Sequence, residues 1–199
     1  MSHQYSMLSI MNTALVSRGW DEITSENDGT AEFRVMMRNW PSIVEAELEG
    51  GKYEFSKAQA SLVTRIEGRF GKRDGFLIPN DALTVRHLWL AGSGARNFVD
   101  WVADGEAVYV DSPSGCHIEY LTVPDPSIWS ANFSRGVQHR LEAVLIRALE
   151  GEAREAQEAE MMAEIAFQTA RTLASQQRAA RPLLRKSAFA MARFDSGSY

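Results

Sequence analysis

The sequence predicts an α+β protein: a helical bundle built from N- and C-terminal helices, an inserted antiparallel β domain, and an extended C-terminal tail. Three observations predict it. Apolar residues recur at helical spacing near the N-terminus, the pattern changes to alternation after Tyr53, and helical spacing returns after a proline-bounded elbow at residues 123–127. The predicted parts are one helical domain from residues 1–52 and 124–180, an inserted β domain over 53–123, and a docking tail over 181–199.

Two helices are predicted before residue 52. The first ends near Gly19, since glycine favours the left-handed conformation that closes a helix. The second begins after Thr30, whose hydroxyl can cap the helix N-terminus. Pro41 lacks a backbone donor and clashes with the preceding turn, so we expect a kink or a restart near residues 39–40. The expected apolar faces are Leu8, Met11, Ala14 and Leu15 in the first helix, and Phe33, Met37, Trp40, Val44 and Leu48 in the second.

Strands are predicted in the middle of the chain. Apolar and polar residues alternate over residues 62–66, and residues 69–75 read as a charged, glycine-rich loop. Further strands are expected over residues 83–90, 98–102, 107–110 and 117–121, with a turn at 111–115 between the last two. The aromatic residues Trp89, Trp101, Tyr109 and Tyr120 could stack on bases, but strand positions favour a role in the core or an interface.

The chain after the elbow shows a helical pattern that continues almost unbroken for roughly fifty residues. Asp125 is expected to accept hydrogen bonds as a turn or N-cap residue. A broad apolar face comes first and a thin stripe of alanines follows, with Met162, Ile165 and Leu173 adding bulk beside the stripe. Pro182 ends the pattern. The broad face contains Phe133, Val137, Leu141, Val144, Leu145 and Ala148, and the stripe contains Ala153, Ala156, Ala163, Ala170 and Ala174.

Charge is sorted along the C-terminal part of the chain. Residues 150–164 carry six acids and one base, whereas residues 165–199 carry six bases and one acid. A solvated helix followed by a disordered tail needs no such sorting, and apolar residues suit a free tail poorly. We therefore predict a tail that docks on a partner. The predicted contact residues are Arg181, Leu183, Leu184, Arg185, Lys186, Phe189, Arg193 and Phe194.

Composition narrows the classes of function. The formal net charge of −5 argues against a general nucleic-acid binder, because such binding depends on Lys and Arg neutralising phosphates. The single cysteine, Cys116, excludes an internal disulfide and a zinc site with several cysteines. The sequence begins without the pattern of a signal peptide and contains no apolar run of about 20 residues, so we expect a soluble intracellular product without a membrane partner.

No catalytic, metal or cofactor site is predicted. His87 and His117 fall in expected strands, and Cys116 and His117 point to opposite faces because they are neighbours in one strand. The segment Gly92-Ser93-Gly94 is not followed by the Gly-Lys-Ser/Thr of a phosphate-binding loop. A nucleophile, a base and an orienting group are not recognisable together, so an enzyme is the weakest reading.

Five segments, in order, resemble the head-to-tail adaptor proteins of short-tailed bacteriophages, often called tail tubular protein A. The family more often has tryptophan where Tyr53 stands, and Pro41 inside a helix is less usual there. The segments are Gly19-x-x-x-Ile23-Thr24-Ser25 before the helix containing Ala31, Tyr53-x-Phe55-Ser56 with Leu62, the run from Phe76 to Leu83, the run from Tyr120 to Trp129, and the helix with Phe133 and Leu141.

The resemblance implies a structural virion protein at the portal vertex of the tail, made in the host cytoplasm. It implies a homo-oligomeric ring, usually a dodecamer, between the portal and the nozzle of the phage tail. The C-terminal segment 181–199 would be the arm that docks on the portal. The residues that contact the nozzle are not identified. DNA passes through such a ring without specific binding, and the negative charge of each copy would repel the genome and keep it sliding. The alternatives are a nucleic-acid-binding regulatory protein that uses its basic tail, or another tail-completion connector.

Overall fold

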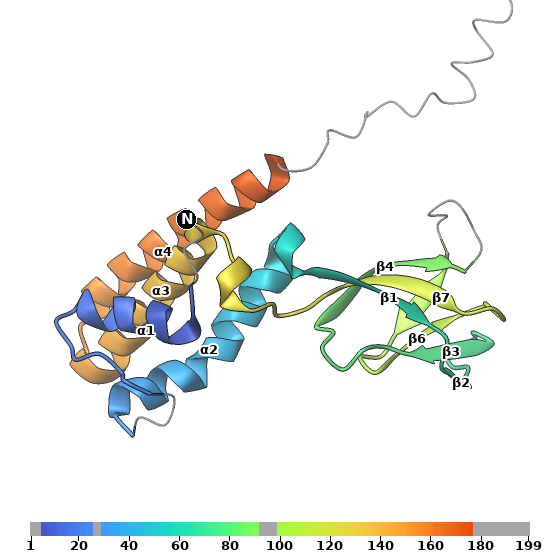
Figure 1. Cartoon of the computed structure of the whole chain (residues 1–199), viewed down its shortest axis with the longest axis horizontal. Helices are drawn as coiled ribbons and strands as arrows, with labels where there is room; N and C mark the ends of the chain where they lie inside the picture. Colours follow the sequence, from blue (N-terminus) through green and yellow to red (C-terminus); the bar gives the residue numbers. More distant parts are fainter. Residues whose placement is uncertain (1–4, 26–28, 92–98, 177–199) are drawn as a thin grey trace, which may run out of the picture.

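The computed structural model describes residues 5–25, 29–91 and 99–176 and has an α+β fold with two antiparallel sheets (Figure 1). The helices gather at one end of an elongated molecule and the strands at the other (Figure 1). This confirms the predicted fold class, and the predicted tail lies outside the described residues. The elements are α1 (Met7–Val16), α2 (Ala31–Gly50), a 3-10 turn (Glu54–Ser56), β1 (Lys57–Leu62), β2 (Arg65–Glu67), β3 (Asp74–Leu77), β4 (Thr84–Leu90), β5 (Trp101–Ala103), β6 (Ala107–Val110), β7 (Cys116–Leu121), a 3-10 turn (Pro126–Ile128), α3 (Ala131–Leu145), a π-helical turn (Ile146–Glu150) and α4 (Ala153–Gln176).

Gly19 closes the turn that follows α1, in the capping role that was predicted for it. This glycine has φ +76°, the left-handed conformation that glycine adopts without steric cost. The amide of Gly19 donates to the carbonyl of Val16 at 3.0 Å, and the amide of Trp20 donates to that of Leu15 at 3.1 Å. These two bonds form a Schellman motif, which satisfies carbonyls that the helix leaves open.

Helix α2 begins at the predicted cap, where the Thr30 hydroxyl accepts from the Phe33 amide at 3.3 Å. The expected restart near residues 39–40 does not occur, because Ala31–Gly50 is one helix that contains Pro41. Its buried side chains before and after the proline belong to one hydrophobic core, which holds the two halves together. The expected burial of Met37 is also wrong, since Met36 is buried and Met37 is exposed.

The strands form two sheets, with orders β1-β7-β4 and β2-β3-β6-β5, and all neighbours are antiparallel. Residues 69–75 do not all form a loop, because Asp74 and Gly75 begin β3 and pair with Val110 and Tyr109. The Asp74 carboxylate accepts from the Ser112 amide at 3.0 Å, so pairing overrides the low strand preference of aspartate and glycine. The two sheets share one hydrophobic cluster, formed by Leu62, Phe76, Leu88, Val108, Val110, Cys116, Ile118 and Tyr120.

The helical pattern after the elbow divides into two helices. Gly151 adopts φ +75° after the π-helical turn, and α4 then packs along α3. The wider π turn moves Ala148 off the buried face, so its expected burial is wrong. Ala153 is exposed as well, because it lies in the first turn of α4, ahead of Ala156, the first buried alanine.

The elbow fixes the position of α3 against α2. Asp125 accepts from the Ser127 amide at 2.8 Å, which confirms its predicted turn role. The Trp129 indole donates to the Pro124 carbonyl at 3.0 Å and stacks on Trp40 with ring centroids 5.6 Å apart. Helix α3 then runs through the bundle, where α1, α2 and α4 each pack on it. No helix of the described residues is apolar and long enough to cross a bilayer.

The contact between α3 and α4 predicts the effect of one glycine substitution. A Cβ atom at Gly136 would lie 2.5 Å from the ring of Phe167, which is buried. Gly136→Ala should therefore lower the free energy of unfolding by about 1–3 kcal/mol, measured by urea denaturation. The control is Gly50→Ala, where a Cβ meets nothing within 4 Å and stability should stay nearly constant. Equal stability of the two variants would contradict this account of the packing.

Candidate assembly surface

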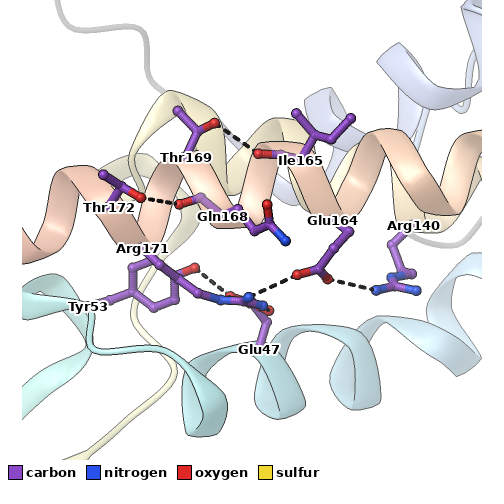
Figure 2. Close-up of polar contacts among 9 residues, drawn as sticks. All are labelled: Glu47, Tyr53, Arg140, Glu164, Ile165, Gln168, Thr169, Arg171 and Thr172. Atoms are coloured by element: carbon purple, nitrogen blue, oxygen red, sulfur yellow. Dashed lines mark hydrogen bonds and ion pairs between the residues drawn. The ribbon is translucent and has the colours of Figure 1, made fainter.

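Helix α4 has two sides of different chemistry (Figure 2). The inner side packs on α3 through the alanine stripe, and Ala156, Ala163, Ala170 and Ala174 are buried as predicted. The bulky residues expected beside the stripe do not add to the core. Met162, Ile165 and Leu173 are 57%, 59% and 45% exposed, and the neighbouring Met161, which was not part of the prediction, is 54% exposed.

The outer side of α4 is uncharged over its last sixteen residues, Met161 to Gln176. Only Glu164 and Arg171 carry charge in this stretch, and both turn towards α2 and α3 (Figure 2). An exposed helix normally carries charged residues on its solvent side. We call this surface the α4 face. Its residues are Met161, Met162, Ile165, Gln168, Thr169, Thr172, Leu173 and Gln176.

The hydroxyl groups of this helix are already satisfied. Thr169 donates to the carbonyl of Ile165 at 2.9 Å, and Thr172 donates to that of Gln168 at 2.9 Å (Figure 2). Ser175 donates to the carbonyl of Thr172 at 2.7 Å. Burying a hydroxyl costs little when its hydrogen bond is retained, so another surface could cover this side of α4 without leaving these donors unpaired.

An ion pair with a buried carboxylate and a partly exposed guanidinium lies beneath the inner side of α4. Glu47 of α2 is 8% exposed, and Arg171 binds its carboxylate with two bonds, Nε to Oε1 at 2.8 Å and Nη2 to Oε2 at 2.5 Å. Tyr53, fully buried, donates its hydroxyl to Oε1 of the same carboxylate at 2.5 Å. Two parallel bonds between guanidinium and carboxylate fix orientation as well as distance.

The environment of the cluster raises the pKa of Tyr53 and of Arg171. Burial, followed by the hydrogen bond to Glu47, raises the pKa of Tyr53 well above its ordinary value, so the phenol remains a donor. The hydrogen bond to Glu47 is also the main cause of a raised pKa of Arg171.

Glu164 extends the cluster to a third helix. Its carboxylate accepts from Nη1 of Arg171 at 3.0 Å and lies 3.8 Å from Nη2 of Arg140 on α3. The cluster therefore joins α2, α3 and α4 to the chain that enters β1. It constrains the rotation of α4 about its own axis and turns the two charges of its second half towards α2 and α3.

Two other places in the described part of the chain hold residue types that can react, a Ser–His–Glu group and a cysteine. Ser17 and His139 both bind Glu142, at 2.8 Å and 2.7 Å, so the carboxylate separates the hydroxyl from the imidazole. Cys116 is 1% exposed, and burial raises the pKa of its thiol to about 11. Residues 5–25, 29–91 and 99–176 contain no group of three or more His, Cys, Asp or Glu that could hold a metal ion.

The predicted histidine and aromatic residues lie in the β sheets. His117 stacks on Trp89 at 5.7 Å, and exposed His87 lies 3.9 Å from the Glu119 carboxylate. Tyr109 and Tyr120 are buried, as expected for core residues, whereas Trp89 and Trp101 are half-buried. The eight residues predicted to contact the portal, between Arg181 and Phe194, lie outside the described part of the chain.

The basic loop between β2 and β3 exposes one aromatic ring. Phe70 is 60% exposed at φ +55° and packs edge-on against Tyr109, with ring centroids 5.2 Å apart. Each neighbouring base has an acidic partner, and phosphate would have to compete with these carboxylates. The pairs are Arg69 with Asp104 at 3.9 Å, Lys72 with Asp100 at 2.5 Å and Arg73 with Asp111 at 3.5 Å.

The sequence reasoning missed the Glu47–Arg171 pair, whose members stand 124 residues apart. One local signal was available. Glu47 lies between Val44 and Leu48 on the apolar face of α2, and an acid at such a position needs a partner. No protein-family model matches this chain, and no curated protein sequence matches it.

The buried pair predicts strong coupling between two substitutions. Arg171→Ala leaves the Glu47 carboxylate without its charged partner and should cost about 2–4 kcal/mol of unfolding free energy. With Glu47→Gln as the second change, a double-mutant cycle should give a coupling of about 1–3 kcal/mol. Arg154→Ala is the control, because this 92% exposed side chain pairs with Glu158 on the surface and should change stability by less than about 0.5 kcal/mol. Additive effects of the two core substitutions would contradict the proposed pairing.

Tyr53 predicts a loss of stability at alkaline pH. Its folded-state pKa is raised, so the unfolded chain releases this proton first, near pH 10, and the stabilisation present below that pH is lost above it. Tyr53→Phe should be less stable than the parent at pH 8, by about 1–2 kcal/mol. The difference in unfolding free energy between the parent and Tyr53→Phe should become smaller between pH 10 and 11.5, measured by urea denaturation at each pH. A constant difference across this range would exclude the assigned role of the phenol.

Proposed function

We propose that this chain is a subunit of a virion ring, a head-to-tail adaptor that joins the portal of a short-tailed phage to the tail nozzle and forms part of the DNA channel. The observation that carries the proposal is the α4 face, an exposed and uncharged helix surface fixed in position by a buried ion pair. Exposed apolar surface of this kind is typical of proteins that assemble. The five sequence segments that resemble the adaptor family point to the particular assembly.

The two ends of the molecule suit a connector. The helical bundle holds one hydrophobic core and the β sheets hold another, so the two ends can present different surfaces to different partners (Figure 1). The basic and apolar residues 181–199 follow α4 in the chain, which attaches them to the bundle. We propose that this segment contacts the portal and that the β sheets project towards the nozzle.

The charge distribution suits passage of DNA without specific binding. The chain has a net charge of −5, and the basic residues of the β2–β3 loop are paired with acids. A regulatory protein that binds nucleic acid is the second candidate, and the basic residues after Gln176 favour it. The two candidates differ in their response to salt, since binding to naked DNA weakens steeply as salt rises.

Deletion of residues 181–199 tests the function. The full chain should join purified portal in a complex whose mass, measured by light scattering, corresponds to a ring of copies, and the truncated chain should bind at least tenfold more weakly. A chain with Leu183, Leu184, Phe189 and Phe194 replaced by serine separates the apolar from the basic contribution.

Circular dichroism and urea unfolding should be the same for the full and truncated chains. Absence of portal binding at every salt concentration would contradict the adaptor proposal. Tight, salt-dependent binding to naked DNA in its place would favour the regulatory protein.

A further inference from the structure

A second uncharged helix surface lies on α1. Residues 5–17 contain no charged side chain, and the outer side of α1 exposes Ser9, Thr13 and Val16, the last of these 53% exposed. Thr13 donates to the carbonyl of Ser9 at 2.7 Å, the same internal bond that Thr169 and Thr172 make on α4. The exposed sides of α1 and α4 thus share two properties, absence of charge and hydroxyl groups satisfied within the helix.

A groove runs beside this side of α1. Its volume is about 550 Å³, and among the described residues Glu22 is the one charged residue that lines it. Asn12 is held at its edge by two bonds to the backbone of Ile23, both 2.9 Å long. We call the groove together with exposed Ser9, Thr13 and Val16 the α1 face. The groove lining is Ser9, Asn12, Thr13, Val16, Ser17 and Glu22.

The two faces cannot cover each other within one chain. Helices α1 and α4 both pack on α3, which lies between them (Figure 1), so their outer sides point away from the shared core. The other helices offer charged surfaces instead, such as Arg34, Arg38 and Glu49 on α2 and Arg135 on α3. Burying an unpaired charge is costly, so an uncharged face is best covered by another uncharged face.

We infer that the α4 face of one copy docks on the α1 face of a second copy. This contact is heterologous, because it joins two different surfaces of the same chain. A bound pair leaves one α4 face and one α1 face free, so the contact repeats, and it closes into a ring where the rotation per copy allows. The inference rests on the proposed function in one respect, the assembly of identical copies, and it names the surfaces that such an assembly uses.

Complementary defects test this contact in the full-length chain without portal. Ile165→Glu places a charge on the α4 face, and Val16→Glu places one on the α1 face. Both residues are more than half exposed, so the monomer should keep its fold, which circular dichroism checks. Val63→Glu, at a 75% exposed position on the β side, is the matched control.

Sedimentation velocity should show that the parent and the control associate as concentration rises, and that high salt does not weaken the association. Ile165→Glu alone and Val16→Glu alone should each associate at least tenfold more weakly than the parent. In an equimolar mixture, the Val16→Glu chain keeps an intact α4 face and the Ile165→Glu chain keeps an intact α1 face. The two chains should therefore form one-to-one dimers, which cannot grow further. Cysteines placed at residues 165 and 16 of separate chains should cross-link in the mixture, and buried Cys116 should not compete.

Results of three kinds would overturn the inference. The first is a parent chain that stays monomeric, or an Ile165→Glu variant that associates like the parent. The second is a mixture that fails to form dimers, since this indicates an interface between identical faces. The third is a chain without residues 177–199 that loses association as Ile165→Glu does, because the tail would then cover the α4 face. Portal binding is measured separately, so the adaptor proposal can survive any of these results, and the contact can survive the loss of portal binding.

Discussion

The bond between Arg171 and Glu47 is the constraint on which the arrangement of the helices depends. The alanine stripe allows close approach of α4 to α3, and the buried ring of Phe167 packs against Gly136 of α3. The bidentate pair adds a constraint on the rotation of α4, because it forms only when one side of α4 faces α2. Buried ion pairs seldom add much stability over apolar residues, so the contribution here lies in orientation.

Orientation of α4 determines the chemistry of the surface. If Glu164 and Arg171 pointed outward, the second half of α4 would be an ordinary solvated helix side. Because both pair with residues of α2 and α3, the outer side retains only apolar side chains, amides and internally bonded hydroxyls. The buried cluster and the α4 face are therefore two consequences of one rotation, and a substitution in the first should alter the second.

Local features of the fold could be predicted from the sequence, whereas distant pairings could not. Gly19, Thr30 and Asp125 make their hydrogen bonds within five residues along the chain, so residue type alone identified their roles. Strand β3 begins with Asp74 and Gly75, and pairing with its neighbours β2 and β6 makes this segment a strand. The Glu47–Arg171 pair depends on the same kind of distant information, as does the exposure of Ile165, which looked like core at helical spacing.

The order of elements along the chain has a consequence for synthesis. Strands β1 to β7 are contiguous in sequence, so their two sheets can pair as soon as Leu121 has left the ribosome. The bundle cannot, because α1 and α2 bury their apolar sides on α3 and α4, which are made last. The apolar sides of the amino-terminal helices therefore stay exposed during most of translation. Contacts between residues far apart in the sequence also slow folding. Chaperone demand during synthesis should fall on the first fifty residues, the part of the chain that is made first and buried last.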